Sequence, residues 1–502
     1  MPVELRKISK SFGALIANDG IDLLINDGEI HAILGENGAG KSTLMNILYG
    51  LLQPDSGSIF IDGKLISINS PSDALAQGIG MVHQHFMLIP VFSVAENIVL
   101  GHEKSNFLGS INLDEIRLKI ESISKEFKFE VDPNALIEDL AVGIQQKVEI
   151  IRALIYKAKV LILDEPTAVL TPQETDELLN IMRKLKNQGT SIIFITHKLK
   201  EVLAVADKIT IIRRGKVVAT ALPSASQEEL AMQMVGRPIT MSVEKQPSKP
   251  EQLQLSINKL TVSTPLGFKI VKDVSLDVFG GEIVAVAGVQ GNGQTEFARA
   301  LLNLEEHCTG SVCIDGVEVL GKKVSDAIHA GIGYIPESRE SDGLISSFKV
   351  SENLILDVFN KAPVAGKLFM NLKQVDLGAE KLVKEFDIRL QSIDSQVSSL
   401  SGGNKQKVVL ARELSRQVKV VIASQPTRGL DVGSIEFVHK RIVAERDAGK
   451  AVLLFSTELD EVYSLADRIA VMFKGEIIDI VPATINRSEL GLLMAGVKKV
   501  LR

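Results

Sequence analysis

Long apolar runs are missing from this sequence of 502 residues. Runs such as Ile283–Gly288 and Ile192–Ile195 are far shorter than the roughly 18–20 residues that a helix needs to span a bilayer. The first residues, MPVELRKISKSFG, also lack the apolar core of a signal peptide. We therefore expect a soluble, intracellular chain without a membrane span of its own.

A basic excess is missing as well. The 56 Lys and Arg residues are interspersed among 62 Asp and Glu residues, and the formal net charge is −6 at pH 7. A protein that binds nucleic acid usually carries a basic excess or a basic stripe on one face. The composition therefore argues against DNA or RNA as the main partner.

Cysteine is scarce, since Cys308 and Cys313 are the only two in the chain. The pair could bind a metal ion, but the sequence offers no second pair of ligands beside it. Cys313 stands in the segment GSVCIDG, where an earlier segment, GSIFIDG, has Phe60. This equivalence predicts an apolar core role for Cys313.

The sequence does contain the material for more than one globular domain. It is too long for a single ordinary core, and 45% apolar with 24% charged residues is typical of a soluble globular protein. Both halves read as alternating strands and helices with short, fully apolar strands, which is typical of a buried parallel sheet. The predicted strands are Glu29–Leu34, Val160–Leu163 and Ser191–Ile195 in the first half, and Glu282–Ala287, Val418–Ala423 and Ala451–Phe455 in the second.

The segment GENGAGKST follows the first predicted strand and opens a predicted helix at Lys41–Tyr49. Its pattern binds nucleotide phosphates, because backbone N–H groups and a helix N-terminus converge on them. The lysine adds a positive charge and the hydroxyl is a ligand for Mg²⁺. The predicted phosphate-binding residues are Gly35, Glu36, Asn37, Gly38, Ala39, Gly40, Lys41, Ser42 and Thr43.

A damaged copy of this segment, GVQGNGQTE, occurs later in the chain and has Gln294 where the lysine should be. The register between the copies is tight: Gly288 lies 253 residues after Gly35, and Glu337 lies 253 residues after Gln84. Further along, equivalent residues are all 260 apart, as for Asp164 and Ser424. A duplicated domain with one net insertion explains this register.

A stretch with several prolines, Gly236–Gln254, separates the two halves and is interpreted as an exposed linker. We assign residues 1–238 to a first domain, 239–253 to the linker and 254–502 to a second domain.

The order of motifs identifies a family. The phosphate loop, VHQ, an LSGGQ-like segment, LILDEP and THK follow one another as in the ATP-binding cassette (ABC) domain, and the resemblance covers both halves. More narrowly, VHQHFMLIPVFSVAENIVLG and QPTRGLDVGSIEFVHKRIV resemble the twin-cassette ATPase subunits of simple-sugar importers, and most closely the nucleoside-importer branch. The resemblance implies an α/β protein with two tandem P-loop NTPase domains. Each would have a mainly parallel sheet, an antiparallel β subdomain and a helical signature subdomain.

The resemblance also gives roles to residues of the first half. Asp164 would hold Mg²⁺, together with Ser42 and Gln84, and Glu165 would polarise the attacking water as general base. His197 would contact the γ-phosphate of ATP, and Gln84 would also touch the water and the membrane partner. Phe12 would stack on adenine. A lone histidine at a strand end is usually a polar cap, and most such phenylalanines are simply packed, so these two roles depend on the family.

Damage to the motifs segregates between the halves. In the first half the signature segment reads Leu140–Ile144, with Ala141 in place of serine, and Thr171 replaces an expected aspartate. The second half keeps Ser401, Gly402, Gly403 and Asp431 but loses the hydrolytic residues. The substituted positions there are Gln294, Glu337, Ser424, Gln425 and Thr457.

In the ABC family two cassettes pair head to tail, and each ATP lies between one phosphate loop and the other domain's signature. Paired in this way, the first half's loops and the second half's signature Ser401–Gly403 make one intact site. The other site is altered at nearly every component. We therefore expect one hydrolytic site per chain, and weak or static nucleotide binding at the other.

The implied cofactors and partners follow from the family. They are ATP, Mg²⁺, two transmembrane permease subunits and, indirectly, an extracytoplasmic solute-binding protein, with the chain peripheral at the cytoplasmic face of the cell membrane. The membrane-facing surface is expected near Gln84–Val99 and Glu337–Asn353. Two alternatives remain, a soluble twin-cassette ATPase acting on ribosomes or DNA and a non-hydrolytic scaffold. The short linker and acidic charge argue against the first, and the intact first site argues against the second.

Overall fold

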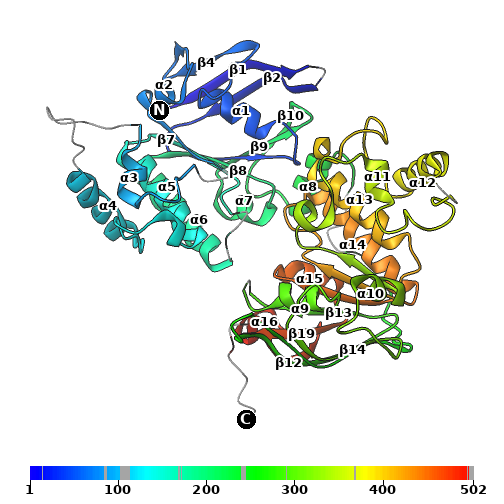
Figure 1. Cartoon of the computed structure of the whole chain (residues 1–502). Coiled ribbons are helices and arrows are strands. Elements are labelled where there is room, and N and C mark those ends of the chain that lie inside the picture. The colour runs from blue at the N-terminus through cyan, green and yellow to red at the C-terminus, as the bar shows by residue number, and fades with distance from the viewer. Residues whose placement is uncertain are drawn as a thin grey trace. The chain divides into compact units, whose positions relative to one another are not determined.

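A computed structural model of the chain describes residues 1–13, 15–83, 87–101, 113–167, 170, 172–238, 243, 245–289, 291–366, 369–494 and 496. Two sites of the sequence analysis, Gln84 and Thr171, lie outside the described residues. The chain divides into two units, Met1–Ile239 and Thr240–Arg502. Figure 1 shows the elements of each unit.

The first unit is built on a 6-stranded sheet in the order β10-β9-β3-β8-β7-β6. Five strands run parallel and the edge strand β10 runs antiparallel to β9. The central strands are buried over their whole length, as the apolar runs predicted. The bounds are β3 Ile30–Leu34, β6 Ile79–Val82, β7 Val160–Asp164, β8 Ser191–Thr196, β9 Lys208–Arg213 and β10 Lys216–Ala221.

A second, antiparallel sheet of this unit has the order β2-β1-β4-β5. Its strands alternate buried and exposed residues, because one face packs on the core and the other faces solvent. The shared core contains Leu5, Leu44 and Ile162, so the sheet packs with α1 and the parallel sheet. The bounds are β1 Val3–Phe12, β2 Leu15–Ile25, β4 Ser56–Ile61 and β5 Lys64–Ile66.

Helices complete the first unit, and α3, α4 and α5 pack together as a helical layer. The helix bounds are α1 Lys41–Leu48, α2 Pro71–Ala76, α3 Val94–Val99, α4 Leu113–Phe127, α5 Val142–Ile155, α6 Pro172–Asn187, α7 Leu199–Val205 and α8 Gln227–Val235. The α5 helix begins directly after Ala141, so the signature segment of this half lies at a helix N-terminus.

The second unit repeats this architecture strand for strand, with the sheet orders β12-β11-β14-β15 and β16-β17-β18-β13-β19-β20. The predicted fold class, with a parallel sheet, an antiparallel sheet and a helical layer in each half, is confirmed. The strand bounds are β11 Leu253–Ser263, β12 Lys269–Phe279, β13 Ile283–Ala287, β14 Cys308–Ile314, β15 Val317–Glu318, β16 Ile332–Ile335, β17 Val420–Ser424, β18 Ala451–Ser456, β19 Arg468–Phe473 and β20 Glu476–Pro482.

The helices of the second unit correspond in order to those of the first, with α13 in the place of α5 and α9 in the place of α1. Their bounds are α9 Gln294–Ala300, α10 Val324–Ala330, α11 Val350–Leu354, α12 Leu372–Glu385, α13 Gly402–Leu414, α14 Val432–Asp447, α15 Leu459–Leu465 and α16 Arg487–Met494.

One expectation from the sequence needs correction. Cys313 is only half-buried, and its sulfur lies 3.7 Å from Ser311 Oγ and from Glu318 Oε2, so it lies in a polar environment rather than in the core. The stretch interpreted as a linker is mostly exposed between 246 and 252, and it is also held at one point: Lys245 Nζ donates to the carbonyl of Leu465 at 2.9 Å and pairs with Asp467. Proline content revealed the lack of regular structure in this stretch but not its attachment.

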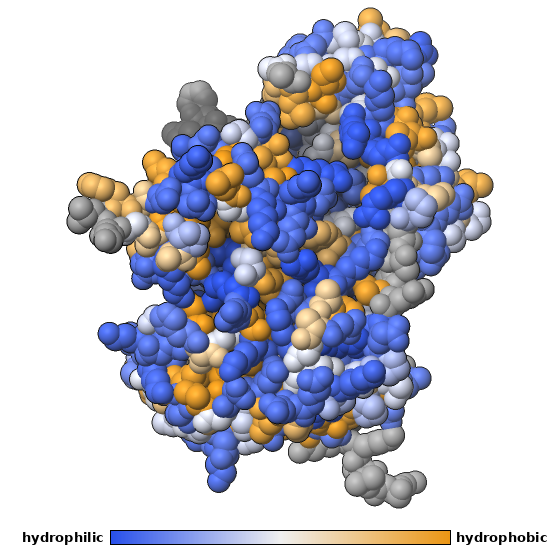
Figure 2. All heavy atoms as spheres, turned by 90° about the vertical axis from the view of Figure 1, so that its right-hand side faces the viewer, coloured by the Kyte–Doolittle hydropathy of each residue, from blue (hydrophilic) through white to orange (hydrophobic). Residues whose placement is uncertain are grey.

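The face of the molecule drawn in Figure 2 is mostly hydrophilic, with hydrophobic residues in small groups between polar ones. Among the described residues, no helix is both long and apolar enough to cross a membrane.

Candidate active site

The loop 35–40 joins β3 to α1 in the first unit. Gly38 and Gly40 have φ angles of 80° and 101°, in the left-handed region that other residues avoid. A Cβ atom on Gly40 would lie 2.2 Å from the carbonyl oxygen of Ala17, so no side chain fits there. The tight loop lets a phosphate approach the backbone and the N-terminus of α1, where the first N–H groups have no acceptor within the helix.

Lys41 lies at the first position of α1 and is only 5% exposed. Its Nζ donates hydrogen bonds to the carbonyl oxygens of Gly35 at 2.8 Å and Glu36 at 2.9 Å. The side chain therefore folds back over the loop and places its positive charge inside the concavity. Asn37, Ala39 and Thr43 lie in the same loop and in the first turn of α1.

The buried Asn18 of β2 supports this loop and was missed by the sequence analysis. Its Nδ2 donates to the carbonyl of Gly40 at 3.0 Å. Asn18 belongs to no motif, and the second half has Val271 at the equivalent position. No sequence signal singles it out, because the contact arises from the packing of β2 beside the loop.

Ser42 and Asp164 meet at the carboxyl end of the parallel sheet. Ser42 Oγ donates to Asp164 Oδ1 at 3.3 Å, and Asp164, the last residue of β7, is 4% exposed. Burial raises the pKa of Asp164 above its ordinary value, while the Ser42 hydrogen bond and the Lys41 charge oppose that shift. A hydroxyl and a carboxylate side by side are the oxygen donors that Mg²⁺ prefers.

Glu165 and His197 form a second pair beside the first. His197 Nδ1 lies 3.2 Å from Glu165 Oε1, and both side chains are about one-tenth exposed. Burial acts to raise the pKa of Glu165, but the His197 hydrogen bond and the charges of Lys41 and Lys198 hold that pKa below its ordinary value. The carboxylate is therefore ionised at neutral pH and able to accept a proton.

Backbone geometry reinforces the position of Glu165. Its φ angle is 47°, an uncommon conformation for a residue with a side chain, and its N–H donates to the carbonyl of Ile195 at 2.9 Å. Such conformations cost on the order of 1–3 kcal/mol and persist where the surroundings fix them. Gln425 in the second unit has a φ angle of 46°, and its N–H donates to the carbonyl of Phe455. The second unit therefore keeps the strained turn without the carboxylate.

Phe12 ends β1 and is 48% exposed, with Lys10 Nζ 5.8 Å from the ring centroid. An exposed ring at a strand end provides a face on which a planar base could stack. The structure thus brings together the loop, Lys41, Ser42, Asp164, Glu165 and His197, and it leaves Phe12 exposed at the end of its strand.

The second unit keeps the loop but not its charges. Gly291 and Gly293 have φ angles of 86° and 94°, as in the first unit, while Gln294 is buried and its Nε2 donates to the carbonyl of Val286 at 2.8 Å. Thr295 Oγ1 donates to Glu337 Oε2 at 2.8 Å, and Thr457 Oγ1 donates to Gln425 Oε1 at 3.2 Å. The lysine, the aspartate and the Glu165–His197 pair of the first unit thus have no ionic counterparts at Gln294, Ser424, Gln425 and Thr457.

The two signature segments differ at their helix caps. Ser401 caps α13 by accepting a hydrogen bond from the Asn404 N–H at 3.4 Å, whereas Ala141 offers no side-chain cap to α5. Asp431 caps α14 by accepting from the Ser434 N–H at 2.8 Å. A Cβ atom on Gly403 would lie 2.1 Å from Ser434 Oγ, so the glycine permits close packing of the two helix starts.

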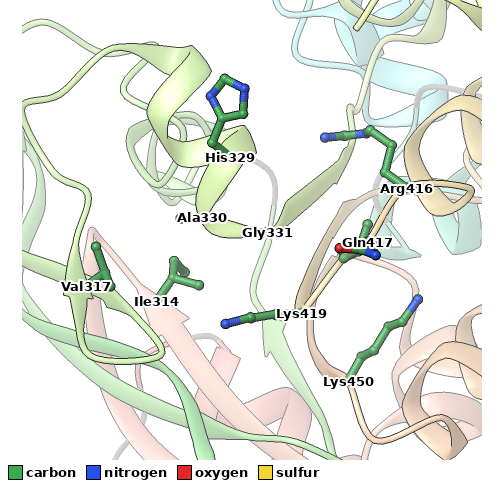
Figure 3. A pocket seen from close by; sticks show the side chains of 10 residues that line it. Ile314, Val317, His329, Ala330, Gly331, Arg416, Gln417, Lys419 and Lys450 are labelled. Atoms are coloured by element: carbon green, nitrogen blue, oxygen red, sulfur yellow. The ribbon is translucent and has the colours of Figure 1, made fainter. Parts of the chain in front are cut away.

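A cavity of about 550 Å³ in the second unit lies away from these groups (Figure 3). Gly331 and Lys419 directly precede β16 and β17, and Lys450 directly precedes β18. The cavity is therefore at the amino ends of parallel strands, whereas the phosphate loop follows a carboxyl end. Ligands of open α/β sheets bind at the carboxyl ends, so this cavity is not the counterpart of the candidate active site.

Comparisons with known proteins agree with these observations. A family model described as ABC transporter matches residues 18–168 and 271–428. The chain is 47% identical to the nucleoside import ATP-binding protein NupA of Lactococcus lactis and 46% identical to the guanosine import ATP-binding protein NupO of Bacillus subtilis. The alignments cover 98% of this chain in both cases, and 98% and 97% of those two proteins.

A relative named for ribose import has a lower identity. The chain is 36% identical to a ribose import ATP-binding protein of Rubrobacter xylanophilus, with 98% of both chains covered. Among solved structures, an archaeal ribosome recycling factor in complex with a ribosomal stalk protein has a TM-score of 0.64 over 98% of this chain and 92% of that chain. At 19% identity this likeness shows the twin-cassette fold alone.

Proposed function

The chain belongs to the ABC transporter family, and from that premise we propose that it is the ATP-hydrolysing subunit of a membrane importer for nucleosides or simple sugars, with a single competent site. The observation that supports the hydrolytic role is the convergence of Lys41, Ser42 and Asp164 beside the Glu165–His197 pair. The soluble ribosome- or DNA-directed alternative is not favoured, because the relatives that match at high identity are import proteins.

The residues of the first unit have different roles in hydrolysis. The loop and Lys41 bind the β- and γ-phosphates of ATP, with the remaining loop residues shaping the cradle. Glu165, ionised and held by its strained turn, accepts the proton of the attacking water. His197 holds the Glu165 carboxylate in place and would contact the γ-phosphate as well. Phe12 provides a stacking face for adenine.

The oxygen atoms of Ser42 and Asp164 fit Mg²⁺, since both are hard ligands and Ser42 Oγ lies 3.3 Å from Asp164 Oδ1. Gln84 would be the third protein ligand. When bound, Mg²⁺ supplies charge neutralisation at the phosphate oxygens. It would also lower the pKa of Asp164, since a cation favours the ionised carboxylate over the protonated one.

The second unit contributes its signature rather than its own catalytic groups. We infer that Ser401, Gly402 and Gly403, with Asp431, complete the site formed by the phosphate loop of the first unit. In the second unit, a lost charge-assisted contact costs about 1.5–3 kcal/mol and a lost general base about 10²–10⁴ in rate. The substitutions at Gln294, Ser424 and Gln425 therefore silence hydrolysis there, and at most weak or static nucleotide binding remains.

Two transmembrane permease subunits are the proposed partners, at the cytoplasmic face of the membrane, with an extracytoplasmic solute-binding protein acting through them. A cavity of about 360 Å³ in the second unit suits a permease segment. It adjoins the predicted membrane-facing stretch 337–353 and combines apolar Leu302 and Leu304 with Arg299 and Tyr334. Burial raises the pKa of Tyr334 to about 12, so its hydroxyl remains a hydrogen-bond donor.

The solute class is tested by uptake of labelled nucleosides and labelled pentoses in cells with and without this chain. We expect ATP-dependent nucleoside uptake that is lost on deletion and restored by the wild-type chain but not by the Glu165→Gln variant. Uptake of pentoses alone would reassign the solute while leaving the importer role in place. Unchanged uptake of every solute in the deletion strain would contradict the importer role.

A further inference from the structure

Arg339 lies against the intact signature of the second unit. It begins a short helical turn, Arg339–Gly343, and its Nη1 donates to the carbonyl of Arg428 at 2.9 Å. Its Nη2 is 3.0 Å from where a Cβ atom of Gly402 would be, so the guanidinium touches the backbone of the signature. Lys405 of α13 pairs with Glu340 at 2.7 Å and fixes this turn to the same helix.

The surroundings of this guanidinium are unfavourable for a cation. Within the part of the chain that the structure describes, no carboxylate forms an ion pair with Arg339, and its buried Nε has no hydrogen-bond acceptor. Burial lowers the pKa of Arg339, opposed by the charge of Glu340, and the neighbouring cation Arg428 lowers it further. An arginine without an ion-pair partner has N–H groups that can donate to an anion.

Arg428, by contrast, has an ion-pair partner. Its Nη1 forms an ion pair with Glu337 Oε1, and Glu337 accepts a second hydrogen bond from Thr295 of the damaged phosphate loop. The Glu337 carboxylate therefore neutralises Arg428 and ties it to its own unit. Of these two arginines, Arg339 is the one that lies against the signature without an ion-pair partner among the described residues.

The duplication supplies an internal comparison. With the offset of 260 residues, Arg428 corresponds to Ala168 in the first half. Arg339 lies where the offset changes, since Glu337 is 253 residues after Gln84 and Asn353 is 256 residues after Asn97, and the first-half stretch 84–97 contains no arginine. The half with the degenerate signature thus has neither arginine, and the half with the intact signature has both. Positive charge beside the signature therefore occurs in the half whose signature is intact.

We propose that Arg339 is a phosphate-contacting residue, which donates to the γ-phosphate of the ATP presented to the signature Ser401–Gly403. The inference depends on the proposed function, because it assumes that this signature receives a nucleoside triphosphate. The planar guanidinium offers two parallel donors to phosphate oxygens, which a lysine does not. Arg339 thereby adds the positive charge that Ser401 and the backbone of the signature lack.

The test compares ATP with ADP. In the full-length chain carrying Glu165→Gln to prevent turnover, the affinities for fluorescent ATP and ADP analogues with Mg²⁺ are measured for wild-type Arg339, Arg339→Gln and Arg339→Lys. We expect Arg339→Gln to weaken ATP binding about 10- to 100-fold, as for a lost charge-assisted contact, and to leave ADP binding unchanged. Arg339→Lys should recover part of the loss, because it keeps the charge but not the fork.

Two controls separate this role from a structural one. Arg389→Ala removes an exposed arginine of the same unit, whose contact with Asp387 is 3.8 Å long, and should change neither affinity. The melting temperature of each variant reports on folding. Equal weakening of ATP and ADP binding, or unchanged ATP binding in Arg339→Gln, would overturn the proposal, and if Arg339→Gln does not fold, the ATP-to-ADP ratio of Arg339→Lys decides.

Ser401→Ala distinguishes this inference from the proposed function. If Ser401→Ala leaves ATP turnover intact, the signature does not serve the active site, and the composite site of the proposed function fails together with the role of Arg339. If Ser401→Ala lowers turnover while Arg339→Gln keeps the wild-type preference for ATP, only the role of Arg339 is wrong.

Discussion

At the scale of single residues, the first prediction concerns Glu165, the proposed proton acceptor. Its pKa is held below the ordinary value despite burial, because His197 and two lysines favour the ionised form. We expect Glu165→Gln to lower ATP turnover by about 10²–10⁴ while ATP binding is retained, since the amide keeps the shape and loses the base. A phosphate-release assay beside a binding assay checks both parts. Wild-type turnover in this variant would remove Glu165 from the mechanism.

A glycine of the loop gives a second prediction at this scale. Gly40→Ala places a Cβ atom 2.2 Å from a backbone oxygen at a φ angle of 101°, so either the loop shifts or the unit is destabilised by on the order of 1–3 kcal/mol. We expect loss of ATP binding together with a lower melting temperature. The matched control is Gly378→Ala in α12, where nothing lies within 4 Å and a helical alanine is favoured by about 1 kcal/mol.

At the scale of elements, the turn that leads into β3 depends on one carboxylate. Glu29 accepts two hydrogen bonds from Asn26, each 2.8 Å long, and lies 2.9 Å from His31 Nδ1. Burial acts to raise the pKa of Glu29, but the hydrogen bonds from His31 and Asn26 lower it from 4.5 to about 2. The turn fixes the start of the strand that presents the phosphate loop.

This shift predicts how stability depends on pH. Because the pKa is lowered in the folded state, Glu29 stabilises the fold fully above pH 4.5, and this contribution is lost as the pH falls towards 2. After allowance for solvent screening, we expect Glu29→Gln to cost roughly 1–2 kcal/mol at pH 7 and little at pH 2–3. Urea denaturation across this range measures the difference, with the exposed Glu121→Gln as control. A cost independent of pH would contradict the assignment.

The elements also show which parts of the structure could be predicted from the sequence alone. The apolar strands were predicted to within two residues at either end, because a strand buried on both faces leaves a continuous hydrophobic run. Contacts between distant side chains were not predictable. Asn18 on Gly40, Glu337 on Thr295 and Arg339 on Gly402 join segments 22, 42 and 63 residues apart, and only packing decides them. Cys313 was assigned to the wrong environment for a different reason: the equivalent Phe60 is itself only half-buried, so the equivalence does not indicate a core position.

At the scale of the whole molecule, the two halves are expected to differ in what a signature substitution does. Ser401→Ala removes the cap of α13 and a hydroxyl proposed to bind the γ-phosphate. We expect turnover to fall at least tenfold, the equivalent of a charge-assisted hydrogen bond. The reciprocal change, Ala141→Ser, restores a cap to α5 but serves a site without lysine or base, so turnover should stay at the wild-type rate. Equal effects of the two changes would argue for two active sites.

Repair of the second unit tests the asymmetry most directly. Gln294→Lys, Ser424→Asp and Gln425→Glu together restore charge to a loop whose glycines and strained turn are already in place. We expect no gain in turnover from these three changes, because the signature that would face them still has Ala141 and Val142. Adding Ala141→Ser, Val142→Gly and Thr171→Asp in the first half, with Glu337→Gln and Thr457→His in the second, should raise the number of nucleotides hydrolysed in a single-turnover burst from one to two per chain. A second burst equivalent from the first three changes alone would show that the degenerate signature is competent, and the division of labour between the halves would then depend on the loops only.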